Sequence, residues 1–366
     1  MSSDIHTQAD NIKRFQANGL PTLIGSIPLT SHEDALDWIF DYTPNLPLWP
    51  QLPGNSLEGM LVQFLEGLPC VLEENNKTFF STEKESFETE QLAFFEDYLQ
   101  LSENKDQLFD SRFSVSRERA EGLYLLLERA RDKKDILALK GQMTGPFTQL
   151  TGVSGQDKRA GYYNPTIREM VVKGLAMKAA WQVSLLKKLG HPAILFIDEP
   201  ALAGLGSTSF LSISNSDIAA DQTELIDATH QAGGLAGIHI CANSDWALIL
   251  SLGYDIINFD AYGFFESFGA FSHEIETFLA RDGIIAWGLV PTSQAESIEK
   301  ETPESLVALW ERQAQALVND NRDMGSILKQ SLITPSCGTG SLSPELAKRV
   351  LFLTKNVSDI LRKKYL

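Results

Sequence analysis

The segment Gly237-Ile238-His239-Ile240-Cys241-Ala242-Asn243 carries the strongest indication of the fold and of a functional site. It begins within an apolar run, Leu235–Ile240, of the kind expected for a buried strand. Residues two apart in a strand point to the same face, so the His239 imidazole and the Cys241 thiol would lie side by side where the run ends. One nitrogen and one sulfur ligand suit zinc, which binds such atoms at about 2.0–2.3 Å.

Two further candidate ligands follow other short apolar runs. Cys337 comes shortly after Leu332-Ile333, and Asp260 directly follows Ile256–Phe259. The third cysteine of the chain, Cys70, is predicted to pack as a small apolar residue. A single histidine or cysteine at a strand end is more often a packing residue than a ligand. The three strand ends together predict one zinc ion bound by side chains from separate strands.

The composition excludes several classes of partner. The net charge is −17, and an acidic surface repels phosphate groups, so we expect no nucleic acid and no membrane as partner. No apolar run approaches the ~20 residues of a membrane helix. Residues 1–13 lack the apolar core of a signal peptide. With three widely spaced cysteines, a cytoplasmic protein is expected.

Short apolar runs alternate with longer amphipathic stretches, which is the pattern of a parallel sheet with helical crossovers. Eight such runs in 366 residues predict an α/β fold, a single (β/α)8 TIM-barrel domain over residues 1–366. Helices are expected to begin where a capping residue precedes proline, at Asn164-Pro165, Thr302-Pro303 and Ser343-Pro344. The predicted strands are Thr22–Ile27, Leu46–Trp49, Ile136–Lys140, Ala193–Ile197, Leu235–Ile240, Asp255–Phe259, Gly283–Trp287 and Ser331–Thr334.

Residues 68–117 do not fit a minimal barrel, because this stretch is long, polar and acidic. Within it, Val71–Phe80 predicts a β-hairpin that turns at Asn75-Asn76. We interpret the stretch as an inserted subregion, a hairpin plus a helical segment, after the second strand and on the active-site side of the barrel. A lid or partner-docking surface and an insertion without function are equally open interpretations.

The adjacent carboxylates Asp198 and Glu199 follow the predicted strand Ala193–Ile197 and are candidate catalytic residues. Acidic residues at this position can also cap the turn that follows. A glycosidase would use a pair of carboxylates, but that interpretation leaves the histidine and the two cysteines of the predicted zinc site unexplained. In a barrel, the C-terminal strand ends that carry all these groups form the active site.

Five motifs occur in one order between about residues 21 and 355: Ile24-Gly25-Ser26-Ile27-Pro28, Gly141-Gln142-Met143-Thr144-Gly145-Pro146, Ile197-Asp198-Glu199-Pro200-Ala201-Leu202, His239-Ile240-Cys241 and Ser336-Cys337-Gly338. They resemble the catalytic barrel of cobalamin-independent methionine synthase, within the uroporphyrinogen decarboxylase/methionine synthase superfamily. The resemblance implies that zinc is bound by His239, Cys241, Cys337 and Asp260. It also implies that Ser26 and Asp198, with Ile24 in the same motif as Ser26, bind a homocysteine-like substrate.

The chain also departs from this family. Full-length members have two barrels, whereas this length allows one. The family's carboxylate ligand is a glutamate, and Asp260 is one methylene shorter, so it either binds from a closer strand or lies outside the ligand set. The family's histidine after strand seven, a proton donor to folate, has no counterpart in Ala286–Thr292. The glutamate-rich motif after strand two is not recognisable. In these respects the chain is more similar to single-barrel core methionine synthases and corrinoid-dependent thiol methyltransferases.

These features predict a zinc-dependent methyltransferase that binds a homocysteine-like thiol as the thiolate and methylates it. Methylcobalamin or another methylcorrinoid is the expected donor, because folate needs a nearby acid to leave and a corrinoid does not. The expected partners are the small-molecule thiol and a corrinoid protein. The identity of the thiol, the donor and the oligomeric state stay open.

Three alternatives are also open. In the first, the protein is an enzyme that methylates another thiol or takes its methyl group from methyl-folate. In the second, it is a non-catalytic zinc- or corrinoid-binding accessory protein. A decarboxylase of the porphyrin branch is the third, but the arginine-rich motif of that branch has only a sparse counterpart in Asn11–Phe15.

Overall fold

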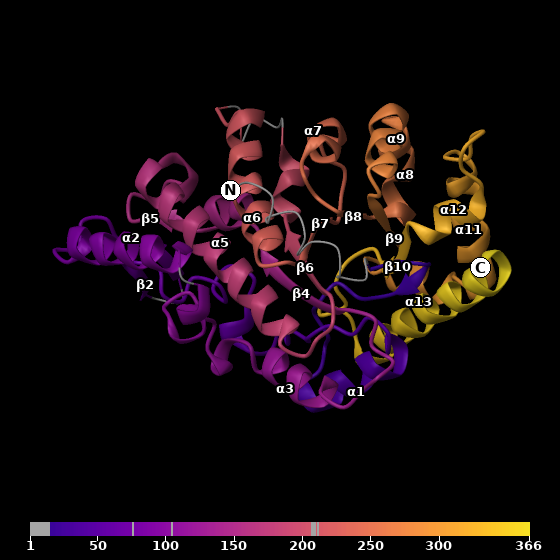
Figure 1. Ribbon diagram of the computed structural model, residues 1–366, viewed down its shortest axis with the longest axis horizontal. Coiled ribbons are helices and arrows are strands. Elements are labelled where there is room, and N and C mark those ends of the chain that lie inside the picture. Colours follow the sequence, from indigo (N-terminus) through magenta and orange to yellow (C-terminus); the bar gives the residue numbers. More distant parts are fainter. Residues whose placement is uncertain (1–14, 75–76, 104, 206–209, 211) are drawn as a thin grey trace, which may run out of the picture.

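The computed structural model describes residues 15–74, 77–103, 105–205, 210 and 212–366. In this part of the chain, seven parallel strands form a curved sheet in the order β1-β10-β9-β8-β7-β6-β4, and helices surround its outer face (Figure 1). The strands are β1 (Leu20–Pro21), β4 (Leu139–Thr144), β6 (Ala193–Asp198), β7 (Leu235–Ile240), β8 (Ile256–Phe259), β9 (Ile284–Val290) and β10 (Ser331–Pro335).

Most of the predicted strands are present, and several of them extend beyond their predicted ends, β4 by the most residues. β7 has the predicted bounds, while β4 begins at Leu139 and runs on to Thr144. The polar Gly141–Thr144 stretch therefore lies inside the sheet and not in the loop after it. This extension brings Thr144 into register with Asp198, at the C-terminal end of β6.

A closed (β/α)8 barrel is not confirmed, because no regular strand joins β4 to β1 in the described residues. The predicted strand Leu46–Trp49 is irregular, and isolated parallel bridges join Leu48 to Lys140 and Ser26 to Gln51. The predicted strand Thr22–Ile27 is also irregular, and regular pairing is limited to β1, which ends one residue before it.

Proline explains why the segment between β4 and β1 is not a strand. Pro47, Pro50 and Pro53 have no N–H group, so this segment cannot donate a continuous ladder of hydrogen bonds. We call residues 45–51, together with residues 22–27, the seam of the sheet.

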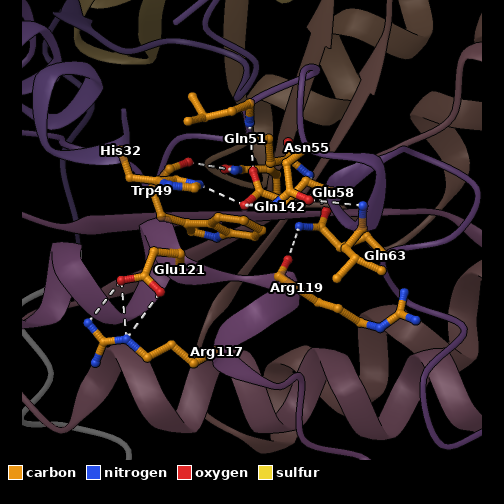
Figure 2. Close-up of polar contacts among 12 residues, drawn as sticks. His32, Trp49, Gln51, Asn55, Glu58, Gln63, Arg117, Arg119, Glu121 and Gln142 are labelled. Carbon is orange, nitrogen blue, oxygen red and sulfur yellow. Dashed lines mark hydrogen bonds and ion pairs between the residues drawn. The ribbon is translucent and has the colours of Figure 1, made fainter. Parts of the chain in front are cut away.

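Glutamine side chains hold the seam in place of a ladder (Figure 2). Gln142 of β4 donates through Nε2 to the carbonyl of Trp49 at 2.8 Å, and Trp49 Nε1 donates to Gln182 Oε1 at 2.9 Å. Gln51 Nε2 donates to Gln63 Oε1 at 2.6 Å. All but Gln51 are almost completely buried, so these bonds are shielded from water.

The helices lie on the outside of the sheet. Helices and strands together contribute most of the buried apolar side chains. The side chains of Asn164, Thr302 and Ser343 cap helices at the predicted starts, each followed by proline. None of the described helices combines the length and the apolar character that a membrane crossing requires. The helices are α1 (His32–Tyr42), α2 (Phe87–Glu103), α3 (Glu121–Ala130), α4 (Pro146–Gly152), α5 (Pro165–Lys187), α6 (Asn215–Gln231), α7 (Trp246–Ser251), α8 (Ala261–Gly269), α9 (Ser272–Ala280), α10 (Ala295–Lys300), α11 (Pro303–Gln315), α12 (Met324–Lys329) and α13 (Pro344–Tyr365).

The stretch predicted to be inserted contains a hairpin and a helix. Strands β2 (Val71–Glu74) and β3 (Lys77–Phe80) pair in antiparallel fashion, and the predicted turn at Asn75-Asn76 lies outside the described residues. β3 also pairs with β5 (Ser154–Gly155), which follows α4, to form a small three-stranded sheet. Helix α2 lies beside this sheet and contacts α5 (Figure 1).

Candidate metal centre

Three of the four predicted ligands lie together at the C-terminal end of the sheet. The ligand atoms of His239, Cys241 and Cys337 are all within 4.8 Å of one another. His239 belongs to β7, Cys241 follows it, and Cys337 follows β10. Strands β8 and β9 separate β7 from β10 in the sheet, so the curvature of the sheet is what brings Cys337 to the other two.

The surroundings of His239 fit a metal ligand. The imidazole is 3% exposed, and its Nδ1 is hydrogen-bonded to Asn258 Oδ1. Its Nε2 is buried and makes no hydrogen bond of good geometry among the described residues, although the Cys241 side chain lies close enough to interact with the ring. A buried nitrogen without a hydrogen bond is unfavourable in a folded protein unless a bound ligand interacts with it. One imidazole nitrogen and two cysteine sulfurs are the donor set that zinc prefers.

The two thiols have opposite electrostatic environments. The hydrogen bond with Cys337, assisted by the neighbouring imidazole of His239, lowers the pKa of the Cys241 thiol. The same hydrogen bond, together with burial, raises the pKa of the Cys337 thiol. The cluster therefore favours one thiolate, Cys241, and only a thiolate is a strong metal ligand.

Asp260 lies near this cluster but is not among the three residues whose ligand atoms converge. Its carboxylate accepts a hydrogen bond from Gly263 N at 2.8 Å and caps α8. Burial raises the pKa of Asp260. The charge on Cys241 also raises this pKa, whereas the charge on His239 lowers it. The position is close to the cluster, and its role as the fourth ligand stays a prediction.

Asp198 lies beside His239, and the buried Lys140 acts on Asp198 through its charge. Asp198 is in register with His239 and is 7% exposed, and its Oδ1 has no hydrogen-bond partner among the described residues. Lys140 is fully buried, its Nζ donates to Ile24 O at 2.7 Å, and it lies 4.4 Å from the centre of the Phe196 ring. Burial raises the pKa of Asp198 and lowers that of Lys140.

Ser26 contacts the loop that carries Cys337. Its carbonyl accepts a hydrogen bond from Thr339 N at 3.0 Å, and its Oγ accepts one from Gly340 N at 3.2 Å. A methyl group at Gly338 would come within 2.2 Å of Ser26 Oγ, so this approach requires glycine. The structure therefore brings the predicted substrate-binding residue Ser26 to the cysteine end of the cluster.

The carboxylate of Glu199 is occupied within the fold. It accepts hydrogen bonds from Phe147 N at 2.9 Å, from Thr148 N and Oγ1 at 2.7 Å each, and from Gln222 Nε2 at 2.5 Å. These bonds anchor the N-terminal turn of α4, whose first N–H groups have no partner within the helix. The catalytic role of Glu199 stays a prediction.

Two residues of the site were not singled out from the sequence, namely Asn258 and Lys140. Asn258 is a polar residue inside the apolar run Ile256–Phe259 and shares a face of the strand with Asp260, two residues later. Lys140 was placed at the end of a shorter predicted strand. For Asn258 the usable signal was a polar side chain within an otherwise apolar strand.

The sequence matches no protein-family model and no curated protein. Among solved structures, it is similar to a B12-independent methionine synthase from Shewanella sp. W3-18-1 in complex with selenomethionine, with 15% identity and a TM-score of 0.48 over 65% of this chain and 67% of that chain. It is also similar to the pneumococcal virulence factor StrH, studied for N-glycan recognition and hydrolysis, with 11% identity and a TM-score of 0.50 over 96% and 85% of the two chains. At these identities the likeness concerns the fold alone.

Proposed function

We propose that this protein is a zinc-dependent methyltransferase that methylates a homocysteine-like thiol, with a methylcorrinoid as the donor. The proposal is supported chiefly by the convergence of His239, Cys241 and Cys337, with a buried His239 nitrogen that makes no hydrogen bond of good geometry in the described part of the chain. These three residues would hold the zinc ion. When bound, zinc would supply the Lewis acidity that keeps a coordinated substrate thiol deprotonated at neutral pH.

The residues around the cluster would orient the substrate. Asp198 has a carboxylate oxygen without a hydrogen bond to any described residue, and this oxygen would accept a hydrogen bond from the substrate ammonium. Ser26, held against the Cys337 loop, would line the opposite side. In the transfer, the substrate sulfur forms a bond to the methyl carbon while the bond from that carbon to the donor breaks, and its electron pair leaves with the donor.

The choice of donor rests on a missing acid. The described stretch Ala286–Thr292 contains no histidine, and the Thr292 hydroxyl is engaged with Ser336 Oγ at 3.0 Å. A folate leaving group needs protonation, whereas a corrinoid does not. We therefore propose a corrinoid protein as the partner, and the unpaired cysteines suit a reducing compartment such as the cytoplasm.

Metal content is the first test of this proposal. About one zinc per chain should co-purify, and Cys241→Ser or Cys337→Ser should lose most of it, because thiolates dominate the affinity of such sites. The chain offers a matched control in Cys70→Ser, which changes a buried cysteine outside the cluster and should keep the metal. Elemental analysis of protein purified without added metal makes the measurement. Full zinc retention by the Cys241→Ser, Cys337→Ser double variant would remove the basis of the proposal.

Turnover is the second test and separates the donors. With homocysteine, the protein should demethylate methylcobalamin much faster than it uses methyl-folate, since a missing general acid costs roughly 10²–10⁴-fold in rate. Asp198→Asn should raise the KM for homocysteine and should have no such effect with a thiol that lacks an amino group. Efficient methyl-folate turnover would overturn the donor assignment. Zinc binding without turnover on either donor would favour an accessory protein.

A further inference from the structure

We propose that Asn258 is a positioning residue of the metal centre, which fixes the proton of His239 on Nδ1 so that Nε2 is the metal-binding nitrogen. The inference rests on the zinc site of the proposed function and assigns a role to a residue outside the ligand set. Asn258 is fully buried and lies directly beside His239 in the register of β7 and β8.

The orientation of the Asn258 amide follows from its other partners. Its Nδ2 donates to the carbonyl of Ala286 at 2.8 Å and to Thr334 Oγ1 at 2.8 Å. A carbonyl oxygen can only accept, so the amide NH₂ must face Ala286, and Oδ1 must therefore face His239. With Oδ1 as the acceptor, His239 Nδ1 must carry the proton of the bond that joins them.

The protonation of one ring nitrogen decides the role of the other. A neutral imidazole has one N–H and one nitrogen with a free lone pair. If Nδ1 donates to Asn258, the lone pair is on Nε2, which is the buried atom without a partner in the described part of the chain. Metal-binding histidines usually donate their other N–H to an oxygen in this way, which fixes the orientation of the ring.

The network that holds Asn258 spans four strands. His239, Asn258, Ala286 and Thr334 belong to β7, β8, β9 and β10 in turn. Sites supported by strands are held more firmly than sites on loops. Thr334 also lies three residues before Cys337, so the same network anchors the strand that leads to the second cysteine of the cluster.

Zinc affinity tests this role in three variants. Asn258→Leu has a similar size and cannot accept from Nδ1, so it should weaken zinc binding by roughly 10–100-fold in competition with a chelator. Asn258→Asp can still accept and should weaken binding less. Thr334→Val removes one partner of Nδ2 and leaves the bond to His239, so its affinity should stay close to that of the unaltered chain. Unchanged affinity in Asn258→Leu would overturn the proposal.

The His239 tautomer can be measured in the unaltered chain, even if Asn258→Leu does not fold. In metal-free protein with ¹⁵N-labelled histidine at alkaline pH, the His239 signals, assigned by their loss in His239→Gln, should show the proton on Nδ1. A proton on Nε2 would overturn the inference while leaving the proposed methyl transfer intact. An Nδ1 proton with the expected order of affinities, but without methyl transfer, would support the inference and contradict the proposed function.

Discussion

Asp198 and Asp260 are both carboxylates at strand ends, yet their surroundings differ. Asp260 uses one oxygen to cap α8, while Asp198 has an oxygen with no partner among the described residues. A carboxylate engaged in a cap is less free to move toward a metal or a substrate. At the scale of the residue, we therefore propose substrate binding for Asp198 and expect Asp260 to be a weak ligand or an outer neighbour of the proposed zinc site.

Two substitutions of Asp260 separate its possible roles. Asp260→Ala should weaken zinc binding by roughly 10–100-fold and should lower the free energy of unfolding by about 1 kcal/mol through the lost cap. Asp260→Asn keeps a good capping residue, so it should retain stability and lose only the effect of charge on zinc. Chelator competition and urea unfolding make the two measurements. Zinc loss as complete as in Cys241→Ser would make Asp260 the fourth ligand, and no loss would place that ligand elsewhere.

At the scale of the element, the start of helix α4 depends on a residue that follows strand β6. Its N–H groups at Phe147 and Thr148 donate to Glu199, which directly follows β6. A methyl group at Gly145 would lie 2.3 Å from the carboxyl carbon of Glu199, so glycine is needed for this approach. The bonds join the start of α4 to the end of β6, close to the candidate site.

Glu199→Ala should destabilise the fold because it leaves buried N–H groups without acceptors. We expect the free energy of unfolding to fall by about 3 kcal/mol. The control Thr148→Val removes only the hydroxyl partner and should cost about 1 kcal/mol. Urea unfolding followed by circular dichroism would measure both. A Glu199→Ala variant with unchanged stability and abolished methyl transfer would instead favour the catalytic role predicted from the sequence.

At the scale of the molecule, the seam is the part of the sheet with the least regular pairing. Its backbone bonds include Ile27 N to Gln51 O at 3.0 Å and Gln51 N to Gly25 O at 3.1 Å. Elsewhere the parallel ladder is continuous from β4 to β10. Local opening should therefore begin at the seam, because fewer hydrogen bonds must break there.

Hydrogen exchange tests this expectation. The amides of Ile27 and Gln51 should exchange faster than those in the centres of β7 and β8 under native conditions. Gln142→Leu removes the donor to the Trp49 carbonyl and should speed exchange in the seam more than in β8. Equal protection of the seam and of β8 in both proteins would show that the glutamine network closes the sheet as firmly as a strand.

Local patterns in the sequence were sufficient for much of the fold. The bounds of β7, the hairpin of β2 and β3, and the helix starts at Asn164, Thr302 and Ser343 were predicted correctly. Such features depend on side-chain periodicity and on capping chemistry, which neighbouring residues carry. The pairing of His239 with Cys241 is of the same kind, because a strand places residues two apart on one face.

Tertiary structure decided the remainder. Cys337 joins His239 only because the sheet curves across β8 and β9, and the acceptor role of Asn258 depends on partners on β9 and β10. The irregular seam and the hydrogen bonds of Glu199 also depend on residues distant in sequence. A residue's type determines which bonds it can make, whereas the packing of the strands determines which partners come within reach.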